Sequence, residues 1–523
     1  MRTMITLTRV IPDCYRDSLS LMQLSARAAE TAGVDAAAVV MATDGNRALL
    51  RDAGLLAGEA DAGANDMLLV VRGDDSEIIG QVLAALEEAL SRDAPASRVV
   101  TGGHAALPRS LAMSLEERSG NLALISVPGD YAAAEALKAL RLGLHVMLFS
   151  ADVSEADEVA LKQYASAKGL LVMGPDCGTA IINGVPLGFA NAVRRGDIGC
   201  IGAAGTGLQE VTTLVNRYGG GLSQVIGTGG RDLSRAVGGL STFQALDALA
   251  RDPATRVIVL VSKPPDPEVA SRVLERAGRS GKPVVVNFLG AAPDAEPASG
   301  LVPARTLEET ARAAAALSQG VAFSPDAAPE RPPAPDSALA DAGGPKAPGR
   351  RFIRGLYSGG TLAAEAVLLM RETVGPVYSN TSMPPFLDDI WKSRGHAIVD
   401  LGDARLTRGR PHPMIDPRLR AERIPREAAD PEVAVILLDV VLGHGAHTDP
   451  AGALAPVIRE AGQAAKRAGK RLSFVASVCG TPDDPQNGTG QESRLRDAGV
   501  IVGRSNAEAV RIALELARKE QHE

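Results

Sequence analysis

A strand, a glycine turn and the start of a helix occur together twice in this chain, once in each half. Residues 198–211 read IGCIGAAGTGLQEV and residues 352–367 read FIRGLYSGGTLAAEAV. In both, an apolar run reaches a Gly-Thr pair, Gly205-Thr206 or Gly360-Thr361, and continues as a helix rich in Ala, Leu and Glu. Because the first amides of a helix are unpaired and lie at its positive dipole end, such a start favours an anion. The repeat predicts two similar α/β units that handle a phosphorylated or carboxylated small molecule.

The similarity between the two halves continues downstream. An Asp-Pro pair precedes an apolar strand in each half, VIVLV at 257–261 and VAVILLDV at 433–440. Each strand leads through a helical stretch to a further strand, at 282–287 or at 471–478. We therefore expect the two glycine-loop helices to face one another across a cleft between the units.

The composition restricts the fold class and the partners. A chain of 523 residues is too long for one core, and with 45% hydrophobic but only 3% aromatic residues its cores must be aliphatic, which suits parallel α/β sheets. The net charge of -7 provides no basic surface for nucleic acid. Four scattered cysteines without metal-ligand spacing fit a reducing compartment. Without an apolar leader or an apolar run of membrane-spanning length, we expect a cytoplasmic protein with no membrane partner.

We predict an α/β fold of several domains with parallel sheets. Residues 1–100 form an N-terminal α/β module, residues 101–195 a Rossmann-like domain, and residues 196–320 and 351–523 two flavodoxin-like domains. Residues 321–350, rich in Pro, Ala, Gly and Asp without a period, form a linker.

Patterns within these domains predict individual elements. The Rossmann-like domain carries a three-strand parallel unit with strands at 123–128, 145–150 and 170–175. Residues 377–424 give few regular signals, and a stretch of that length inside a domain is typical of a functional loop. In the N-terminal module the expected strands and helices are 4–11, 18–31, 38–42, 67–72 and 76–91.

Glycine loops supply the candidate phosphate ligands. Each has an alternative interpretation, because such a turn also serves tight packing of a strand against a helix, and Arg231 beside Asp232 could form only a local ion pair. Lys263, after the strand at 257–261, offers a cation, and Cys479-Gly480-Thr481 at another strand end offers backbone donors. The residues assigned to substrate or phosphate binding are Gly205, Thr206, Gly207, Gly229, Gly230, Arg231, Ser358, Gly359, Gly360, Thr361, Cys479, Gly480 and Thr481.

Two polar segments supply the candidate catalytic residues. In RGRPHPMIDP, prolines fix the backbone around His412, and the guanidinium of Arg410 can bind a carboxylate or phosphate through paired hydrogen bonds. A structural clamp between Arg410 and Asp416 is the alternative. In GHGAHTDP, His444 and His447 are assigned to substrate binding or proton transfer. Their spacing also suits a divalent ion with Asp449, but we expect no metal.

The end of the strand at 170–175 is a further place where ligands collect in open α/β sheets. Pro175, Asp176 and Cys177 lie there. Cys177 is more typical of a small buried thiol than of a nucleophile, because the sequence places no base beside it.

Three segments resemble the alpha subunit of succinyl-CoA synthetase. They are MGPDCGTAIING at 173–184, GCIGAAGTGLQE at 199–210 and IGTGGRD at 226–232, in the same order as in that enzyme. The second repeat unit resembles the carboxy-terminal domain of its beta subunit. The resemblance makes residues 101–195 a CoA-binding-type domain and the two flavodoxin-like domains succinyl-CoA synthetase-like.

Four long segments extend the resemblance to the whole chain. These segments resemble the FdrA family throughout: RGLYSGGTL at 354–362, LGDARLTRGRPHPMIDP at 401–417, LLDVVLGHGAHTDP at 437–450 and ASVCGTPDDPQ at 476–486.

The chain departs from the synthetase where that enzyme does its chemistry. The synthetase relays phosphate through a histidine in a Gly-His-Ala-Gly segment, where this chain reads FLGAAPDAEPASGLVPA at 288–304 and the next histidine is His396. Asp176 stands where the synthetase has Asn, and its CoA-gripping glycine loop is not recognisable in residues 101–104. An ATP-grasp domain is also missing from the pattern. The comparison implies that this chain alone does not make an acyl-CoA at the expense of ATP.

The FdrA family includes the large component of a three-subunit oxamate carbamoyltransferase from allantoin breakdown, which interconverts oxalurate plus phosphate and oxamate plus carbamoyl phosphate. The resemblance implies a carbamoyltransferase subunit with two further operon-encoded subunits, phosphate or carbamoyl phosphate as substrate and no certain cofactor, with a homo-oligomer left open. One alternative is an acyl-CoA synthetase-like ligase that binds CoA or a nucleotide and relies on a partner for the ATP and phosphohistidine functions. Another is a non-catalytic scaffold that senses phosphate or a nucleotide.

Overall fold

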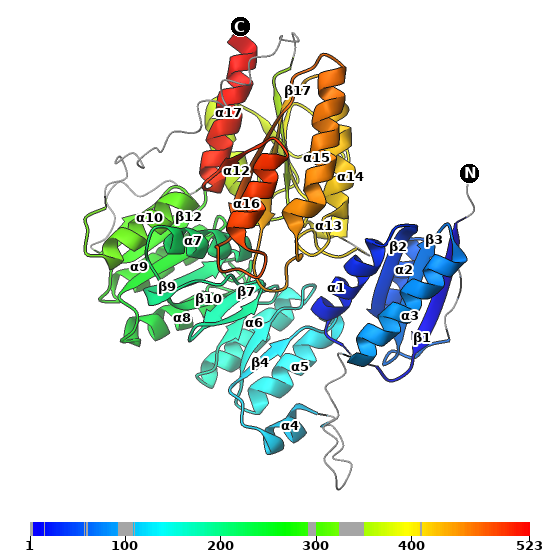
Figure 1. Ribbon diagram of the computed structural model, residues 1–523. Coiled ribbons are helices and arrows are strands. Elements are labelled where there is room, and N and C mark those ends of the chain that lie inside the picture. Colours follow the sequence, from blue (N-terminus) through cyan, green and yellow to red (C-terminus); the bar gives the residue numbers. More distant parts are fainter. Residues whose placement is uncertain are drawn as a thin grey trace.

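The chain is organised around β-sheets whose helices pack on their faces (Figure 1). The computed structural model describes residues 4–14, 16–56, 58, 61–92, 108, 110–290, 300–323, 350–407 and 410–522. Most of the expected linker therefore lies outside the described residues, as do residues 101–104. Within the described ranges, no helix is both long enough and apolar enough to cross a membrane.

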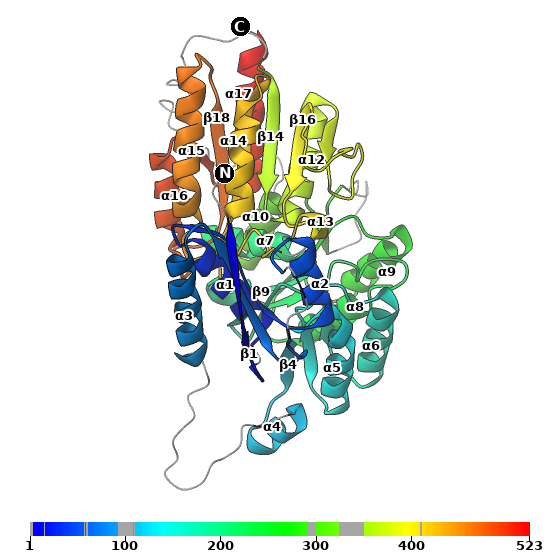
Figure 2. The ribbon, with the colours of Figure 1, turned by 90° about the vertical axis from the view of Figure 1, so that its right-hand side faces the viewer.

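The N-terminal module is a three-stranded sheet in the order β1-β3-β2. Figure 2 shows α3 on one side of β1 and α2 on the other. Both neighbouring pairs are antiparallel, so the expectation of parallel sheets is wrong for this module. The central strand β3 is buried on both faces, because helices cover both sides of the sheet. The sequence patterns missed α2, whose nine residues are mostly polar. The elements are β1 (Ile5–Ile11), α1 (Ser18–Ala29), β2 (Val34–Met41), α2 (Asp44–Asp52), β3 (Met67–Gly73) and α3 (Ser76–Arg92).

The next unit confirms the expected three-strand parallel arrangement, in the order β4-β5-β6. The hairpin that follows leaves this sheet and pairs with the sheet of the first repeat unit. That sheet therefore begins at residue 179, before the expected boundary at residue 196. The elements are α4 (Leu111–Glu117), β4 (Leu122–Ile125), α5 (Gly129–Arg141), β5 (His145–Leu148), α6 (Glu155–Ala167), β6 (Val172–Met173), β7 (Thr179–Ile182) and β8 (Val185–Gly188).

The two repeat units share one sheet topology. The first sheet has the order β13-β12-β11-β9-β10-β7-β8 and the second β15-β16-β14-β17-β18-β19. Taken in chain order, β9 to β13 give the order 2-1-3-4-5 of a flavodoxin-like sheet, and β14 with β16 to β19 give it again. The first strands are β9 (Arg195–Ala203), β10 (Leu222–Gly227), β11 (Val257–Ser262), β12 (Val284–Phe288) and β13 (Leu301–Pro303), and the second β14 (Phe352–Tyr357), β15 (Val377–Ser379), β16 (His396–Asp400), β17 (Val433–Val441), β18 (Ser473–Cys479) and β19 (Val500–Gly503).

Residues 377–424 are more regular than the sequence suggested. Strands β15 and β16 lie in this stretch and pair in parallel beside β14. Both are short, and polar segments surround them, so they gave no clear period. Two helices also begin here, α13 (Ala404–Thr407) and α14 (Arg418–Ala429).

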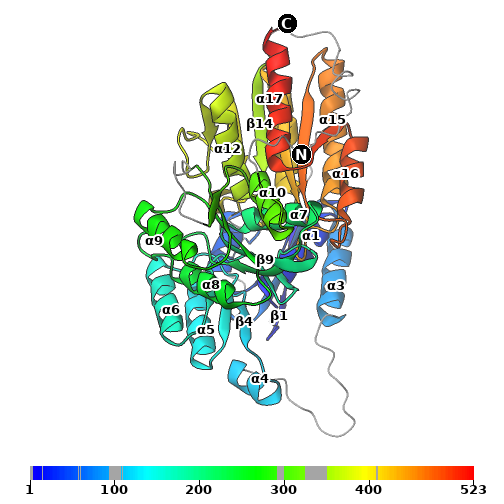
Figure 3. The same ribbon diagram turned by 90° about the vertical axis from the view of Figure 1, so that its left-hand side faces the viewer.

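Four helices form a shared layer between the two sheets (Figure 3). They are α7 (Gly205–Arg217) and α10 (Leu307–Ser318) from the first unit, and α12 (Gly360–Val374) and α17 (Asn506–His522) from the second. One hydrophobic cluster runs through all four, with buried alanines such as Ala314, Ala363 and Ala513 that let the helices approach closely. The outer faces carry α8 (Leu240–Arg251) and α9 (Pro267–Gly278) on the first unit, and α14, α15 (Pro450–Arg467) and α16 (Gly488–Asp497) on the second.

Each unit caps the last helix of the other. Glu210 on α7 accepts the first amide of α17, from Asn506, at 2.9 Å, and Glu365 on α12 accepts the first amide of α10, from Leu307, at 2.7 Å. Each glutamate lies five residues after the glycine that starts its helix, so the pair obeys the repeat. The side chain of Asn506 also donates to Glu365 at 2.8 Å. Exchanged caps therefore fix the two units against each other.

Glu365 predicts a pH dependence of this interface. Burial raises its pKa to about 7 from 4.5, against the hydrogen bonds from Leu307 and Asn506 that favour the carboxylate. The folded state then binds more protons than the unfolded state between these values, so the contribution of Glu365 to the free energy of unfolding falls as pH rises through this window. A Glu365→Gln variant should remove this slope, worth about 3 kcal/mol at roughly 1.4 kcal/mol for each pKa unit.

Urea unfolding of the wild type and the variant between pH 4.5 and 7.5 measures that slope as the difference between their unfolding free energies. Glu372→Gln, an exposed position on the same helix, is the matched control. A wild-type-minus-variant difference that stays constant or rises with pH would contradict the argument.

Candidate functional site

The carboxyl ends of the strands of both repeat units meet at the start of α7 and α12. In a flavodoxin-like sheet, ligands bind where the strand order reverses, between the first and third strands. In the first unit Gly205 follows β9 and Lys263 follows β11, which are those two strands. In the second unit Ser358 follows β14, and Asp439 lies near the end of β17. The switch points of the two sheets therefore open toward one another.

The two glycine-loop helices do face each other, as expected, but their starts are in direct contact. The amide of Thr361 donates to Oγ1 of Thr206 at 3.2 Å. A Cβ built on Gly207 would lie only 2.8 Å from Cγ2 of Thr361, so a larger residue at this position would push the two helices apart. The two helices therefore touch at their N-termini, and the expected open cleft is closed at that point.

The start of α12 already holds an anion, which is the carboxylate of Asp439. Ser358 donates to it from its amide at 2.8 Å and from its hydroxyl at 3.0 Å, and Gly359 donates from its amide at 2.7 Å. Arg420 pairs with the same carboxylate at 2.9 Å. Asp439 is fully buried, so these donors face no solvent. The phosphate-binding role that the sequence suggested for Ser358 and Gly359 is therefore filled by the chain itself.

The start of α7 differs, because among the described residues no carboxylate accepts a hydrogen bond from its amides as Asp439 does before α12. Gly205 is exposed and Thr206 is partly exposed. Within the described part of the chain, the amides of Gly205, Thr206 and Gly207 have no hydrogen-bond acceptor. The amide of Gly360, the first of α12, likewise has no acceptor there, but Gly360 lies beside the carboxylate of Asp400. The start of α7 is therefore the one that favours an external anion.

Three ionisable side chains surround the backbone beside the two helix starts. A Cβ built on Gly360 would lie 2.6 Å from Oδ2 of Asp400 and 3.6 Å from Nζ of Lys263. A Cβ built on Gly402 would lie 3.2 Å from Oδ1 of Asp400 and 2.5 Å from Nε2 of His412. These two glycines therefore keep the space between the three side chains open.

The surroundings set the protonation of these groups. Burial raises the pKa of Asp400 to about 6, against the attraction of Lys263 and the amide of Gly402. Burial also lowers the pKa of His412 to about 4, which keeps the ring neutral near pH 7. Because Nδ1 of His412 accepts the amide of Met414 at 3.2 Å, the proton of the neutral ring lies on Nε2, the nitrogen next to Gly402 and Asp400.

Asp176 also interacts electrostatically with Lys263. The residue as a whole is exposed, but burial of its carboxyl group by the surrounding protein raises the pKa of that group. The positive charge of Lys263 opposes this rise. Its backbone adopts φ 55°, a left-handed conformation that Asp and Asn tolerate. The strand end at Asp176 thus reaches the cluster of Lys263, Asp400 and His412. Cys177 is buried, and burial raises its thiol pKa to about 12, so it remains protonated.

The GTGGRD loop, residues 227–232, serves mainly to join units. Arg231 donates to Glu158 on α6 at 3.0 Å and to the carbonyl of Val153 at 2.7 Å. This ion pair links two units, so it is neither the expected ligand contact nor a local pair with Asp232. Gly229 has φ 88° and its Cβ would lie 2.6 Å from the carbonyl oxygen of Pro175, whereas a Cβ on Gly230 would meet open space.

Other candidates also have structural partners. The side chain of Arg410 is half exposed and contacts Glu422 at 3.5 Å, and no contact joins it to the cluster or, as a clamp, to Asp416. His447 pairs with Glu30 of the N-terminal module at 2.6 Å, and His444 is exposed. The structure thus gives Arg410 and His447 surface or domain contacts and leaves His444 exposed, and their catalytic role stays a prediction.

The strand end at Cys479 contributes to the junction between the units. Cys479 and Gly480 are enclosed, and a Cβ on Gly480 would lie 2.6 Å from Leu442. The amide of Thr481 donates to Asp484 at 2.8 Å, and its hydroxyl donates to the carbonyl of Ala192 at 2.7 Å. The expected ligand donors are thus used inside the protein.

Sequence reasoning missed Asp400. The signal was available, because Asp400 ends the apolar run AIVD and its strand precedes a glycine, but that run lay in a stretch interpreted as a loop.

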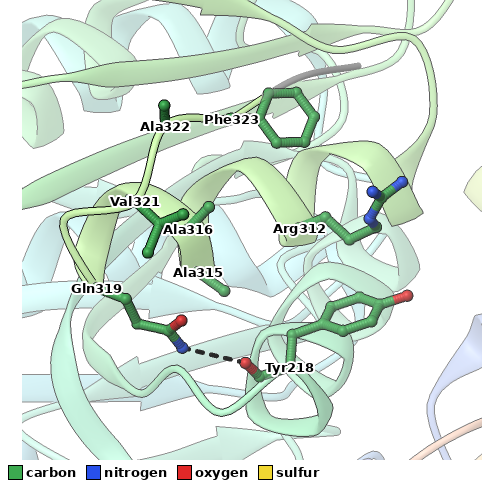
Figure 4. A pocket seen from close by; sticks show the side chains of 8 residues that line it. All are labelled: Tyr218, Arg312, Ala315, Ala316, Gln319, Val321, Ala322 and Phe323. Carbon is green, nitrogen blue, oxygen red and sulfur yellow. Dashed lines mark hydrogen bonds between the residues drawn. The ribbon is translucent and has the colours of Figure 1, made fainter. Parts of the chain in front are cut away.

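A cavity of about 240 Å³ lies away from this site (Figure 4). It is lined by Tyr218, Arg312, Ala315, Ala316, Gln319, Val321, Ala322 and Phe323. Tyr218 follows the last residue of α7, so the cavity is at the opposite end of that helix from Gly205. The cavity and the cluster of Lys263, Asp400 and His412 have no lining residue in common.

Family models match three parts of the chain. One described as "CoA-ligase" matches residues 356–516, one described as "AllF, heavy metal-associated domain" matches residues 4–106, and one described as "CoA binding domain" matches residues 193–290. The last match falls on the first repeat unit, not on residues 101–195, for which we expected a CoA-binding-type domain.

Individual proteins give matching results. The chain is 44% identical over 512 residues to the uncharacterized protein YahF of Escherichia coli K12, which covers 97% of this chain and 98% of YahF. It is 28% identical over 159 residues to the alpha subunit of the ADP-forming succinate–CoA ligase of Aquifex aeolicus, covering 29% of this chain and 50% of that subunit. Among solved structures, a dinucleotide-forming acetyl-coenzyme A synthetase 1 of Ca. Korarchaeum cryptofilum aligns with 77% of this chain and 84% of its own, at 18% identity and a TM-score of 0.30.

The heavy metal named in the description of the N-terminal family does not fit the residues present. Cys14 is the only cysteine in residues 4–106. Across the described ranges, no three His, Cys, Asp or Glu side chains gather in a way that could hold a metal ion. Because soft metals need more than one thiolate or imidazole ligand, no step of the chemistry is assigned to a metal.

The buried pair of Asp439 and Arg420 predicts a large loss of stability on substitution. Asp439→Asn removes the charge but keeps the shape, and it leaves Arg420 buried without a counter-ion. Breaking a buried pair in this way costs about 3–5 kcal/mol of unfolding free energy. Asp388→Asn, in an exposed pair with Arg394, is the matched control and should cost about 1 kcal/mol or less. Urea unfolding measures both, and equal losses would contradict the role assigned to Asp439.

Proposed function

Because the chain belongs to the FdrA family, we propose that it is the large subunit of a carbamoyltransferase that exchanges a carbamoyl group between an N-carbamoyl acid and phosphate. The reaction we propose is oxalurate plus phosphate to oxamate plus carbamoyl phosphate, carried out with two further subunits. This reaction would supply carbamoyl phosphate during the breakdown of purine nitrogen.

The observation that carries the proposal is the inequality of the two helix starts. Asp439 accepts the amides of Ser358 and Gly359 just before α12, whereas the first amides of α7 have no acceptor among the described residues. Nζ of Lys263 would lie 3.6 Å from a Cβ built on Gly360, the first residue of α12. This difference supports the binding of one phosphate-sized anion at the start of α7, near the carboxylate of Asp400 and the neutral ring of His412. Transfer to phosphate needs such donors on the phosphate and on the oxygen that becomes negative in the transition state.

The sequence also supports a reaction without a phosphoenzyme. Residues 288–304, which follow the strand after which the synthetase carries its phosphohistidine, contain no histidine. Direct attack of phosphate on a carbamoyl carbon requires no such relay.

The test is to purify the chain with its operon-encoded partners and to follow carbamoyl phosphate formed from oxalurate and phosphate. We expect formation that depends on phosphate and on all three subunits. Thr206→Val is the informative variant, since it removes the hydroxyl at the open helix start, and we expect a KM for phosphate raised about 10-fold, as for the loss of one charge-assisted hydrogen bond. Absence of carbamoyl phosphate from a folded, complete complex would refute the proposal.

A second candidate is an acyl-CoA ligase that depends on a partner, and the matches to CoA-ligase and CoA-binding families favour it. The open amides at the start of α7 also suit a phosphate of CoA. The same complex is therefore mixed with ATP, CoA and a panel of carboxylates, and ADP and thioester are followed. We expect no thioester, and its formation would make the ligase the correct function.

A further inference from the structure

The cluster of Lys263, Asp400 and His412 contains polar atoms that the protein leaves unused. In the part of the chain that the structure describes, Nζ of Lys263 has no hydrogen-bond or ion-pair partner, although the residue is only partly exposed. Oδ1 of Asp400 accepts the amide of Gly402 at 2.9 Å, while no donor is seen on Oδ2 within the same described ranges. Nε2–H of His412 is likewise without an acceptor there. A cation, a donor and an acceptor therefore share one space.

Two of the groups come from separate strand ends and the third from a connecting segment, so their convergence is a property of the fold. Lys263 follows β11 of the first unit, Asp400 ends β16 of the second, and His412 lies in the segment between α13 and α14. Gly360, whose built Cβ would lie close to both Asp400 and Lys263, is the first residue of α12. An anion on the amides of α7 would lie beside this space, because Thr206 and Thr361 are in hydrogen-bond contact.

We propose that Lys263 and His412 hold the oxygens of an N-carbamoyl acid and that Asp400 moves the proton of its carbamoyl transfer. This assignment rests on the proposed function. Lys263 pairs with the substrate carboxylate, and Nε2–H of His412 donates to the carbamoyl oxygen as it becomes negative. Both donors are fixed before the substrate arrives, which is the arrangement that stabilises a developing oxyanion.

The step balances without a further reactant. An oxygen of hydrogen phosphate attacks the carbamoyl carbon, and Asp400 accepts the proton of the phosphate hydroxyl. A new C–O bond forms and the C–N bond to the leaving amide breaks, with its electron pair going to nitrogen. Asp400 then returns the proton to that nitrogen, so that carbamoyl phosphate and a free primary amide leave and Asp400 is ionised again.

The charges around Asp400 set the pH range of this role. Lys263 lowers its pKa, while Asp403, Asp439 and burial raise it, and the balance leaves it at about 6. His412 faces it as a neutral ring above about pH 4. Because Asp400 must be ionised to accept a proton, kcat is expected to rise with pH through about 6 and to level off above it.

The test compares variants of the complete three-subunit complex. Asp400→Asn should lower kcat at least 100-fold, as for loss of a general base, with KM for phosphate changed less than threefold. The residual activity should no longer rise through pH 6. Asp388→Asn, at an exposed position paired with Arg394, is the matched control and should retain the wild-type pH profile. Asp400→Glu is the second variant, for use if Asp400→Asn does not fold, and should restore a titrating limb with reduced kcat.

The two donors have different signatures. Lys263→Met should raise KM for oxalurate at least 10-fold, and exposed Lys168→Met is its control. His412→Leu should lower kcat about 100-fold, and His412→Gln should recover part of that loss because its amide can still donate. A fully active His412→Leu complex would overturn its role.

The outcomes separate this inference from the proposed function. If the wild-type complex makes carbamoyl phosphate and Asp400→Asn retains a third or more of kcat, the assignment of Asp400 is wrong and the proposed function stands. If the wild-type complex makes none, the proposed function fails, and calorimetric titration with oxalurate alone decides the rest. Binding that weakens at least 10-fold in Lys263→Met then supports the substrate site, and unchanged binding overturns it.

Discussion

The carboxylate of Asp439 makes the arrangement of the two repeat units possible. Two helix starts carry positive partial charge, and their contact through Thr206 and Thr361 brings like charges together. Asp439 neutralises one of them from inside the protein, and Arg420 holds that carboxylate in place. The other start remains positive. The carboxylate of Asp439 thus stabilises the start of α12, and the start of α7 remains available for an anion from solution.

The repeated fold and the unrepeated residues have different tasks. The same strand order in both units places equivalent loops at equivalent points, and the glutamates at 210 and 365 obey that symmetry by exchanging helix caps. The repeat does not extend to the cluster of Lys263, Asp400 and His412. Lys263 follows β11, whereas the equivalent strand of the second unit, β17, carries Asp439. The shared strand order and the exchanged helix caps fix the position of one unit against the other. The residues that differ between the units place a cation, a carboxylate and an imidazole close together.

The sequence predicted the elements that follow from local patterns of residues. It did not predict contacts between segments that lie far apart in the sequence. The glycine loops and their helices follow from apolar period and helix-start chemistry, so β9, α7, β14 and α12 were found in place. The contact of His447 with Glu30 could not be predicted, because the two residues lie more than 400 positions apart in the sequence. Arg410 was chosen for a dense polar surrounding, and only the tertiary structure tells an exposed polar loop from a lined site. Asp400 was overlooked because the short apolar run of β16 lies between polar segments, and the whole stretch was interpreted as a loop.

The exchanged caps have a consequence for assembly. In proteins whose related units are separate chains, such a junction forms by a bimolecular encounter and loosens on dilution. Here Glu210 and α17, like Glu365 and α10, belong to one polypeptide, so they meet at an effective concentration set by the chain and not by the amount of protein in solution. The space between the units is therefore formed at any expression level, and any partner subunit that binds this protein encounters a junction already complete.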